Sequence, residues 1–370
     1  MKKPGYILFM TFSILALCTA LVSAFLTKGM MHKQVTSIIL EQEVMNQLAL
    51  SIPALAQSFL SFSADDLKGL DKSDKPSGKD QGESVKQDSN EKEDTTNFHK
   101  KLLEKILPVV NIPQIFMLKE LDNTIPYSIN LTFFCESGKI NINGLYDQVH
   151  KKFYNEGSPD NDQKVFATWL FEKIAELTEQ KSLLQPFIEH VKQRKLPFND
   201  VTELLSIKEF AQVFQHNIFY DKVVDEKKNK LFLTDVFTAT SEDDTIQPWL
   251  LSPSVCALLG IEKEQKTQEF ENKANKKIDL SGFKITSSWQ TDWDALLKPV
   301  YGITYDKIPL PVTGVLSKEF KVNVFSIGVT ITRESIEGEN NIKTRIFAIL
   351  KEKKLPDDSI TYDIIKVYLV

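Results

Sequence analysis

Histidine and cysteine are scarce in this 370-residue chain, which contains five histidines and three cysteines. The histidines are His32, His99, His150, His190 and His216, and no two of them have the helical spacing of a metal site. The sequence also lacks a Gly-x-Ser-x-Gly nucleophile turn and a phosphate-binding glycine loop. We therefore expect a protein that is not an enzyme.

Positive charge is not in excess either, because the formal net charge is -5 and the pI is about 5.7. A surface that binds phosphate needs a strong basic excess, so nucleic acid is not an expected partner. Of the three cysteines, Cys18 lies in an uncharged N-terminal stretch. Cys135 and Cys256 remain, and the sequence leaves open whether they form one disulfide or two buried thiols.

The N-terminus carries Lys2 and Lys3 and then no charged residue between positions 6 and 26. At about 1.5 Å per residue a helix of this length reaches roughly 30 Å, the thickness of the hydrocarbon core of a bilayer. The positive-inside rule keeps both lysines in the cytoplasm and sends the remaining chain across the membrane. A cleaved signal peptide, with Val22-Ser23-Ala24 before the cut, and a plain signal anchor are the alternatives.

A helical pattern continues after this stretch to about position 62. Apolar residues recur every seven positions, and others follow the same repeat on the adjoining face: Ile38, Met45, Ile52 and Phe59, with Leu48, Leu55 and Phe62. Such a stripe needs a partner surface, so residues 27–62 are expected to form a stalk helix. Pro53 predicts a kink or a break in the helix near Ser51 and Ile52, because proline removes a backbone donor.

Residues 63–97 are rich in charge and poor in apolar side chains, which predicts a disordered linker or, alternatively, a charged docking segment. Order is expected to resume at 98. Alternation predicts strands at 127–134, 320–325, 328–333, 342–350 and 360–369, and apolar periodicity predicts helices at 166–177 and 183–191. The fold class predicted is α+β, with antiparallel strands.

A short motif follows the first predicted strand and its acidic turn. It reads Gly138-Lys139-Ile140-Asn141-Ile142-Asn143 and is followed by Leu145-Tyr146. This run resembles general secretion pathway protein K, the family of large minor pseudopilins of type II secretion. Under the resemblance, Gly5 is the residue after which a prepilin peptidase cuts, and Tyr6 is the mature N-terminus. Met10 stands at the fifth mature position, where most pilins have a glutamate and this family does not.

The resemblance also implies a domain organisation. Its parts are a leader (1–5), a transmembrane helix (6–26), a periplasmic stalk (27–62), the linker (63–97), the first part of a pilin-like core (98–145), an inserted helical domain (146–300) and a C-terminal sheet (301–370). The long helix is expected to pack on the antiparallel sheet. The inserted domain is expected to resemble helix-hairpin-helix or SAM-like units, at 196–207, capped by Asn199 or Asp200, and again at 252–261.

Acidic loops are the candidates for a metal site. Calcium takes carboxylate oxygens, and Asp160 with Asp162 and Asp243 with Asp244 are the pairs that could hold it, although neither has an EF-hand pattern. Family members can carry calcium in the inserted domain. The resemblance therefore makes calcium a candidate cofactor, without establishing one and without identifying its ligands.

The function implied is a non-enzymatic tip subunit of the type II secretion pseudopilus, which initiates or caps the fibre and supports protein export. The expected partners are other minor pseudopilins, the prepilin peptidase and the inner membrane, with the N-terminus cytoplasmic and the bulk periplasmic. The alternatives are a minor pilin of a type IV pilus and a membrane-anchored periplasmic binding protein or enzyme.

Overall fold

A computed structural model describes twelve stretches of the chain: residues 4–61, 102–103, 105–107, 109–118, 127–159, 161–220, 231–241, 244–261, 298–317, 322–333, 342–356 and 359–370. Side chains are described in these ranges except at 4–18, 34, 37–38, 299–300 and 342. The expected linker at 63–97 lies outside the described residues. Within them, helices and an antiparallel sheet are combined in one molecule.

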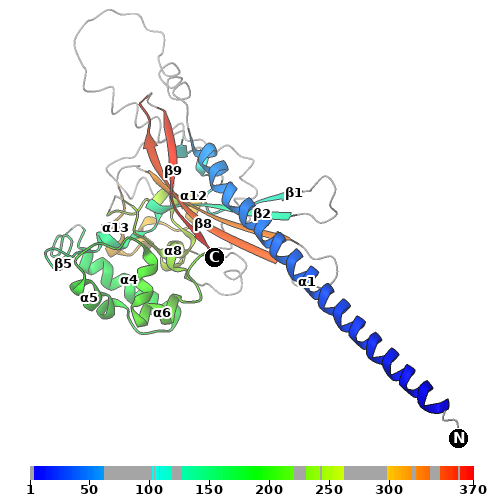
Figure 1. Cartoon of the computed structure of the whole chain (residues 1–370). Coiled ribbons are helices and arrows are strands. Elements are labelled where there is room, and N and C mark those ends of the chain that lie inside the picture. Colours follow the sequence, from blue (N-terminus) through cyan, green and yellow to red (C-terminus); the bar gives the residue numbers. More distant parts are fainter. Residues whose placement is uncertain are drawn as a thin grey trace, which may run out of the picture.

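The dominant helix is α1 (Pro4–Leu60), which runs away from the rest of the molecule toward its N-terminus (Figure 1). It is continuous through Pro53, so the expected break near Ser51 does not occur. Pro53 is buried, and its buried neighbours Ile52 and Ala56 anchor the helix on both sides of it. This packing offsets the hydrogen bond that proline removes. Among the residues whose side chains are described, which leave out 4–18, no helix is long and apolar enough to cross a membrane.

The sheet has five strands in the order β1-β2-β7-β8-β9, all antiparallel. The strands are β1 (Gln114–Leu118), β2 (Tyr127–Cys135), β7 (Val324–Arg333), β8 (Ile342–Lys354) and β9 (Ile360–Leu369). The end of the strand expected at 320–325 and the strand expected at 328–333 form one continuous strand that begins at Val324, because Gly328 pairs with Thr132 without interrupting the ladder.

The last part of α1 packs on one face of this sheet. Its buried positions recur every three or four residues, as a helix on a flat surface requires: Met45, Ala49, Ile52, Ala56 and Leu60. The facing side chains come from alternate positions of the strands and include Ile129, Phe133, Ile327, Ala348 and Tyr362. The ring of Phe59 lies 5.5 Å from that of Phe133 between centroids. Gln42 donates a hydrogen bond to Thr344 at 2.6 Å.

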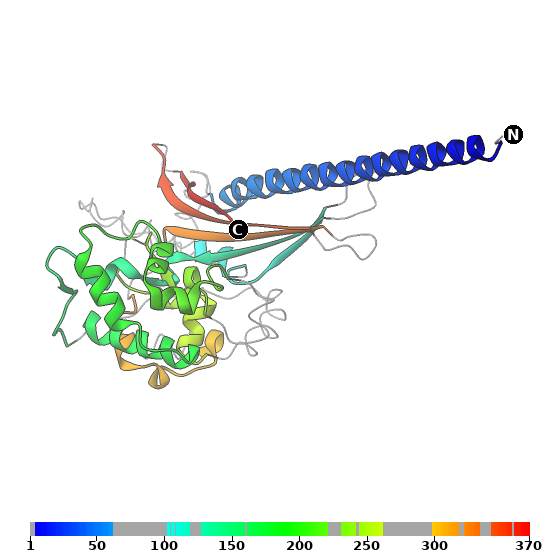
Figure 2. The same ribbon diagram turned by 60° about the horizontal axis from the view of Figure 1, so that its bottom comes forward.

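A helical body, inserted between β2 and β7, covers the opposite face of the sheet, as Figure 2 shows. Its larger helices are α4 (Gln163–Thr178), α5 (Leu184–Gln193), α6 (Lys208–Phe214) and α9 (Pro253–Leu258). The remaining described helices are 3₁₀ helices or single α-helical turns: η3 (Val201–Ser206), α8 (Leu233–Val236), η4 (Pro248–Leu250), α12 (Lys298–Tyr301), η6 (Tyr305–Lys307) and α13 (Leu310–Thr313). Two-residue strands complete it: β4 (Tyr146–Asp147) with β5 (Lys152–Phe153), and β6 (Phe237–Thr238) with β3 (Ile140–Asn141).

Phenylalanines form the core of the helical body. Phe171 lies at the centre, with its ring 5.2 Å from Phe187, 5.8 Å from Phe210 and 6.3 Å from Phe237 between centroids. All four side chains are fully buried. The body therefore has an apolar core large enough to hold its short helices together.

Candidate assembly surface

The most apolar exposed surface of the described residues runs along α1. Its exposed large side chains are Leu21, Val22, Phe25, Leu26, Met30, Met31, Val35, Ile39, Leu40, Val44, Leu50 and Leu55. Phe25 has 72% of its surface exposed and Leu55 has 68%. Soluble monomers rarely expose so many large apolar side chains along one helix, so this surface is the first candidate for a contact with another molecule.

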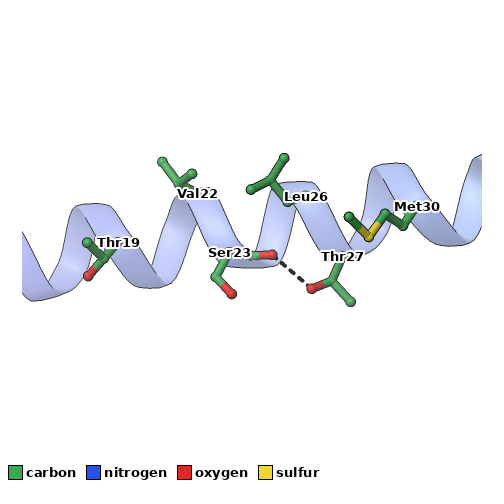
Figure 3. Close-up of a pocket in the computed structure, with 6 residues that line it drawn as sticks. All are labelled: Thr19, Val22, Ser23, Leu26, Thr27 and Met30. Atoms are coloured by element: carbon green, nitrogen blue, oxygen red, sulfur yellow. Dashed lines mark hydrogen bonds between the residues drawn. The ribbon is translucent and has the colours of Figure 1, made fainter.

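Two threonine hydroxyls on this surface are satisfied within the helix. Figure 3 shows Thr19, Val22, Ser23, Leu26, Thr27 and Met30, all from α1, lying along one stretch of the helix. The Thr27 hydroxyl donates to the carbonyl oxygen of Ser23 at 2.9 Å, and the Thr36 hydroxyl donates to His32 at 2.8 Å. Hydroxyls bonded back to the preceding turn need no water, so they are compatible with an apolar environment. One helix lines this stretch, which makes it a contact surface rather than an enclosed pocket.

The residues expected to form an assembly stripe divide into two groups. Met45 and Ile52 are buried against the chain's own sheet, and Leu48 is partly buried at its edge. Leu55 is exposed, and Phe59 is 37% exposed while it contacts Phe133. The seven-residue repeat therefore holds α1 on the sheet along one side and leaves an apolar flank beside it. The side chains of Ile38, Met10 and Tyr6 lie outside the described residues, and Gly5 is placed in the first turn of α1.

The Gly138–Asn143 motif lies where the sheet meets the helical body. It begins after β2 with η1 (Glu136–Gly138) and continues through β3 into η2 (Ile142–Gly144). Lys139 is fully buried and donates hydrogen bonds to the Glu136 carboxylate and, at 3.1 Å, to the Ser326 hydroxyl of β7. The Ser326 hydroxyl donates to the same Glu136 oxygen at 2.5 Å.

Aromatic rings enclose this buried ion pair. The Lys139 ammonium lies 5.6 Å from the ring centre of Phe134 and 5.5 Å from that of Phe347. A buried charge needs a partner and hydrogen bonds to offset lost hydration, and the Glu136 carboxylate, the Ser326 hydroxyl and the two ring faces supply them. The sequence indicated this motif, but the burial of its lysine depends on strands that are distant in the chain.

The first residue of the motif is a glycine because the backbone of Leu250 lies close to it. A Cβ atom on Gly138 would lie 1.8 Å from the carbonyl oxygen of Leu250, a backbone atom that cannot move aside easily. The asparagines form the next contacts: Asn141 accepts from the backbone of Asn143 at 3.1 Å and donates to the carbonyl oxygen of Ser241 at 3.0 Å. The motif therefore fastens the sheet to the helical body.

A second polar junction joins β9 to η3. Asp200 caps η3 in a capping box with Glu203, and its carboxylate also accepts from the Tyr368 hydroxyl and from Lys366 at 3.2 Å. Burial by itself would raise the pKa of Asp200. The hydrogen bonds from Tyr368 and Thr202 and the Lys366 charge outweigh burial and hold this pKa below its ordinary value.

Cys135 and Cys256, the two cysteines whose side chains the structure describes, are buried free thiols, so no disulfide joins them. Burial raises the pKa of Cys135 to about 12, which keeps its thiol protonated and unreactive at neutral pH.

Of the acidic metal candidates, Asp160 and Asp243 lie outside the described residues. Asp162 caps α4 and accepts backbone hydrogen bonds from Gly157, Lys164 and Val165. Asp244 lies against Gly144, where a Cβ atom would be 2.7 Å from its carboxylate. Nowhere in the described ranges do three His, Cys, Asp or Glu side chains gather to hold a metal ion.

Comparisons with known proteins give a likeness to solved structures and no match to a family model or a curated sequence. The fold is similar to a chain of the GspK-GspI-GspJ complex from the type 2 secretion system of enterotoxigenic Escherichia coli. The TM-score is 0.33 and the identity is 12%, over 77% of this chain and 97% of that one. A likeness at this level establishes neither the family nor the function.

Proposed function

We propose that this chain is a non-enzymatic minor pseudopilin that takes the tip position of a type II secretion pseudopilus. In this role α1 packs against the long helices of neighbouring minor pseudopilins. The head, which consists of the sheet and the helical body, initiates or caps the fibre. The observation that carries the proposal is the combination of a projecting apolar helix with a head built on its other end.

The exposed face of α1 supports a helix-packing role. Exposed apolar side chains from Leu21 to Leu55 give the helix a surface that neighbouring helices can cover, and the back-bonded hydroxyls of Thr27 and Thr36 do not oppose this burial. Burial of apolar area contributes roughly 25 cal/mol per Å², so covering these side chains with a neighbouring helix favours association.

The place of the helical body supports a terminal position. The body lies at the end of the molecule away from the free N-terminus of α1, on the sheet face that α1 does not cover (Figures 1 and 2). A subunit added beyond this head would have to bring its own projecting helix past the body. The head therefore favours a subunit that ends a fibre.

The N-terminal residues complete the proposal. Positions 6–26 carry no charge and follow Lys2 and Lys3, which suits a single-pass anchor in the inner membrane with the head in the periplasm. Processing by a prepilin peptidase after Gly5 would release Tyr6 as the new N-terminus.

Intact mass of the protein, purified from cells with and without a prepilin peptidase, tests this proposal. A chain that begins at Tyr6 only when the peptidase is present supports assembly of the pilin class. A chain that begins at Phe25 indicates an ordinary signal peptide, and an uncut chain indicates a static anchor. Either of the last two results contradicts the fibre-tip role.

A further inference from the structure

Strand β1 is an edge of the sheet that no other described strand covers. Its five residues pair with β2 from Gln114 opposite Leu131 to Leu118 opposite Tyr127, and the sheet order begins at β1. The backbone groups on its outer side therefore point away from the sheet. An uncovered edge is a template for another strand, and proteins usually block such edges with charges, prolines or bulges.

Strand β1 has none of these protections. Its exposed side chains are Ile115, Phe116, Met117 and Leu118, with exposed fractions of 66%, 50%, 55% and 43%. Successive side chains alternate between the two faces of the sheet, so both faces of the strand are apolar. A helix or a flat surface could cover one face only. A strand lying in the plane of the sheet satisfies the backbone and extends both apolar faces.

The opposite edge, β9, is protected. Its register shifts beside Leu350 at a bulge, and Asp363 forms an ion pair with Lys353 at 2.9 Å. Lys366 and Tyr368 are fastened to Asp200 of the helical body. Among the described strands, one edge of the sheet is therefore closed to strand addition and the other is open.

The open edge adjoins the exposed flank of α1. Phe59 contacts Phe133 of β2, so the side of α1 that carries Phe59 faces the half of the sheet that ends in β1. Leu55 and Leu48 lie on this same side of the helix, four and eleven residues before Phe59. The face of β1 that carries Phe116 and Leu118 is the face on which α1 lies, because their partners Ile129 and Tyr127 belong to the core beneath α1.

A second copy of this chain does not suit this edge if the proposed function holds. Helix α1 runs parallel to β8. Gln42 contacts Thr344 near the start of β8, and Ser61 contacts Thr361 of β9, which pairs with Lys353 near the end of β8. Antiparallel pairing of two β1 strands would point the two α1 helices in opposite directions. Parallel pairing of the two would put the helices on opposite faces of the joined sheet. Neither arrangement lets two α1 helices pack side by side in one fibre.

We propose that β1 is the docking edge for a strand of a different subunit, one whose long helix lies beside the exposed flank of α1. The incoming strand is extended, uncharged and apolar on both faces, because β1 offers no charge to pair with it. This inference rests on the proposed function and names the partner surface within it. The closed β9 edge limits strand addition to one side, which suits a subunit that ends an assembly.

Photo-crosslinking of the full-length chain in cells tests the inference, with benzoylphenylalanine placed at one position at a time. The positions are Met117 on β1, Val367 on the protected edge and Val35 on the projecting part of α1. The crosslinked peptides are sequenced by mass spectrometry. We expect Met117 to crosslink to an edge strand of a different subunit, Val35 to crosslink to the helix of a subunit, and Val367 to give at least tenfold less product.

The outcomes separate the two proposals. A Met117 product with a second copy of this chain, or no Met117 product while Val35 crosslinks to a helix, overturns the β1 inference and leaves the proposed function standing. No product at either position overturns both. Once the partner is sequenced, Met117→Lys should lower its co-purification at least tenfold, whereas Met117→Thr, which keeps an uncharged strand former, should lower it less than threefold.

Discussion

Asn143 forms two hydrogen bonds with the backbone of Phe198, 55 residues away in the chain. Its amide oxygen accepts from the N–H of Phe198 at 2.8 Å, and its amide nitrogen donates to the carbonyl oxygen at 2.9 Å. The side chain therefore pairs with Phe198 much as a neighbouring strand would. This pairing fixes the loop before η3 to the motif that follows β2, and so fixes the helical body to the sheet.

Asn143→Ala should lower the free energy of unfolding by about 1–3 kcal/mol, because two backbone groups lose their partner in a partly buried place. Denaturant unfolding of the purified head measures this change. Asn161→Ala, in the loop before α4, is the control and should change stability by less than about 0.5 kcal/mol. An equal loss of unfolding free energy in the two variants would show that the hydrogen bonds of Asn143 do not stabilise the fold.

Breaking the buried ion pair of Lys139 and Glu136 should lower the free energy of unfolding by more than Asn143→Ala does. Lys139→Met leaves an unpaired buried carboxylate and should cost about 3–5 kcal/mol, whereas Lys139→Met with Glu136→Gln should recover part of this loss. Lys353→Met removes one partner of an exposed pair on β8 and β9 and should cost less than about 1 kcal/mol. A double variant as unstable as the single one would contradict the electrostatic explanation.

Replacing Gly138 of the motif and Gly29 of α1 by alanine should have opposite effects on stability. Gly138→Ala brings a Cβ atom into the backbone of Leu250 and should lower the melting temperature of the head by several degrees. Gly29→Ala meets no atom within 4 Å, and alanine favours a helix by about 0.5–1 kcal/mol over glycine, so this variant should not lower it. Calorimetry of both variants decides the matter.

The acid limb of the stability curve should depend on Asp200. Its pKa in the folded protein is below the value of about 3.9 in an unfolded chain, so its contribution is present above pH about 4 and is lost as pH falls through the folded pKa. Asp200→Asn keeps a capping side chain but removes the charge. Unfolding followed between pH 2 and 6 should therefore show a flatter acid limb in this variant. An unchanged limb would mean that other carboxylates dominate.

Exposed side chains of α1 should affect assembly, whereas its buried side chains should affect folding. Leu55→Glu places a charge on an exposed position and should leave the melting temperature within about 2 °C while it abolishes co-purification of neighbouring subunits. Ile52→Ala removes a side chain that is 4% exposed and should cost about 2–5 kcal/mol of stability. If both variants stayed folded and both lost their partner subunits, the exposed flank of α1 that carries Leu55 would have no distinct role in assembly.

The sequence by itself determined most of the longer helices and strands, because those choices depend on local periodicity, but it predicted neither β1 nor α6. The strand expected at 360–369 is β9 with the same bounds, and the helix expected at 166–177 lies within α4. The capping role of Asp200 also follows from a local signal, the glutamate three residues later. Patterning could not show that 320–325 and 328–333 form one strand, since the paired strand β2 decides it.

Only the tertiary structure decided which apolar residues are used inside the molecule. Met45 and Leu55 belong to one helical pattern, yet the first is buried under the sheet and the second is exposed. The burial of Lys139 beside Ser326 and the open edge of β1 likewise depend on strands far apart in the chain. A sequence pattern records that a side chain needs an apolar surface, but the surface itself is assembled by folding, and only folding decides whether it comes from the same chain or from a neighbour.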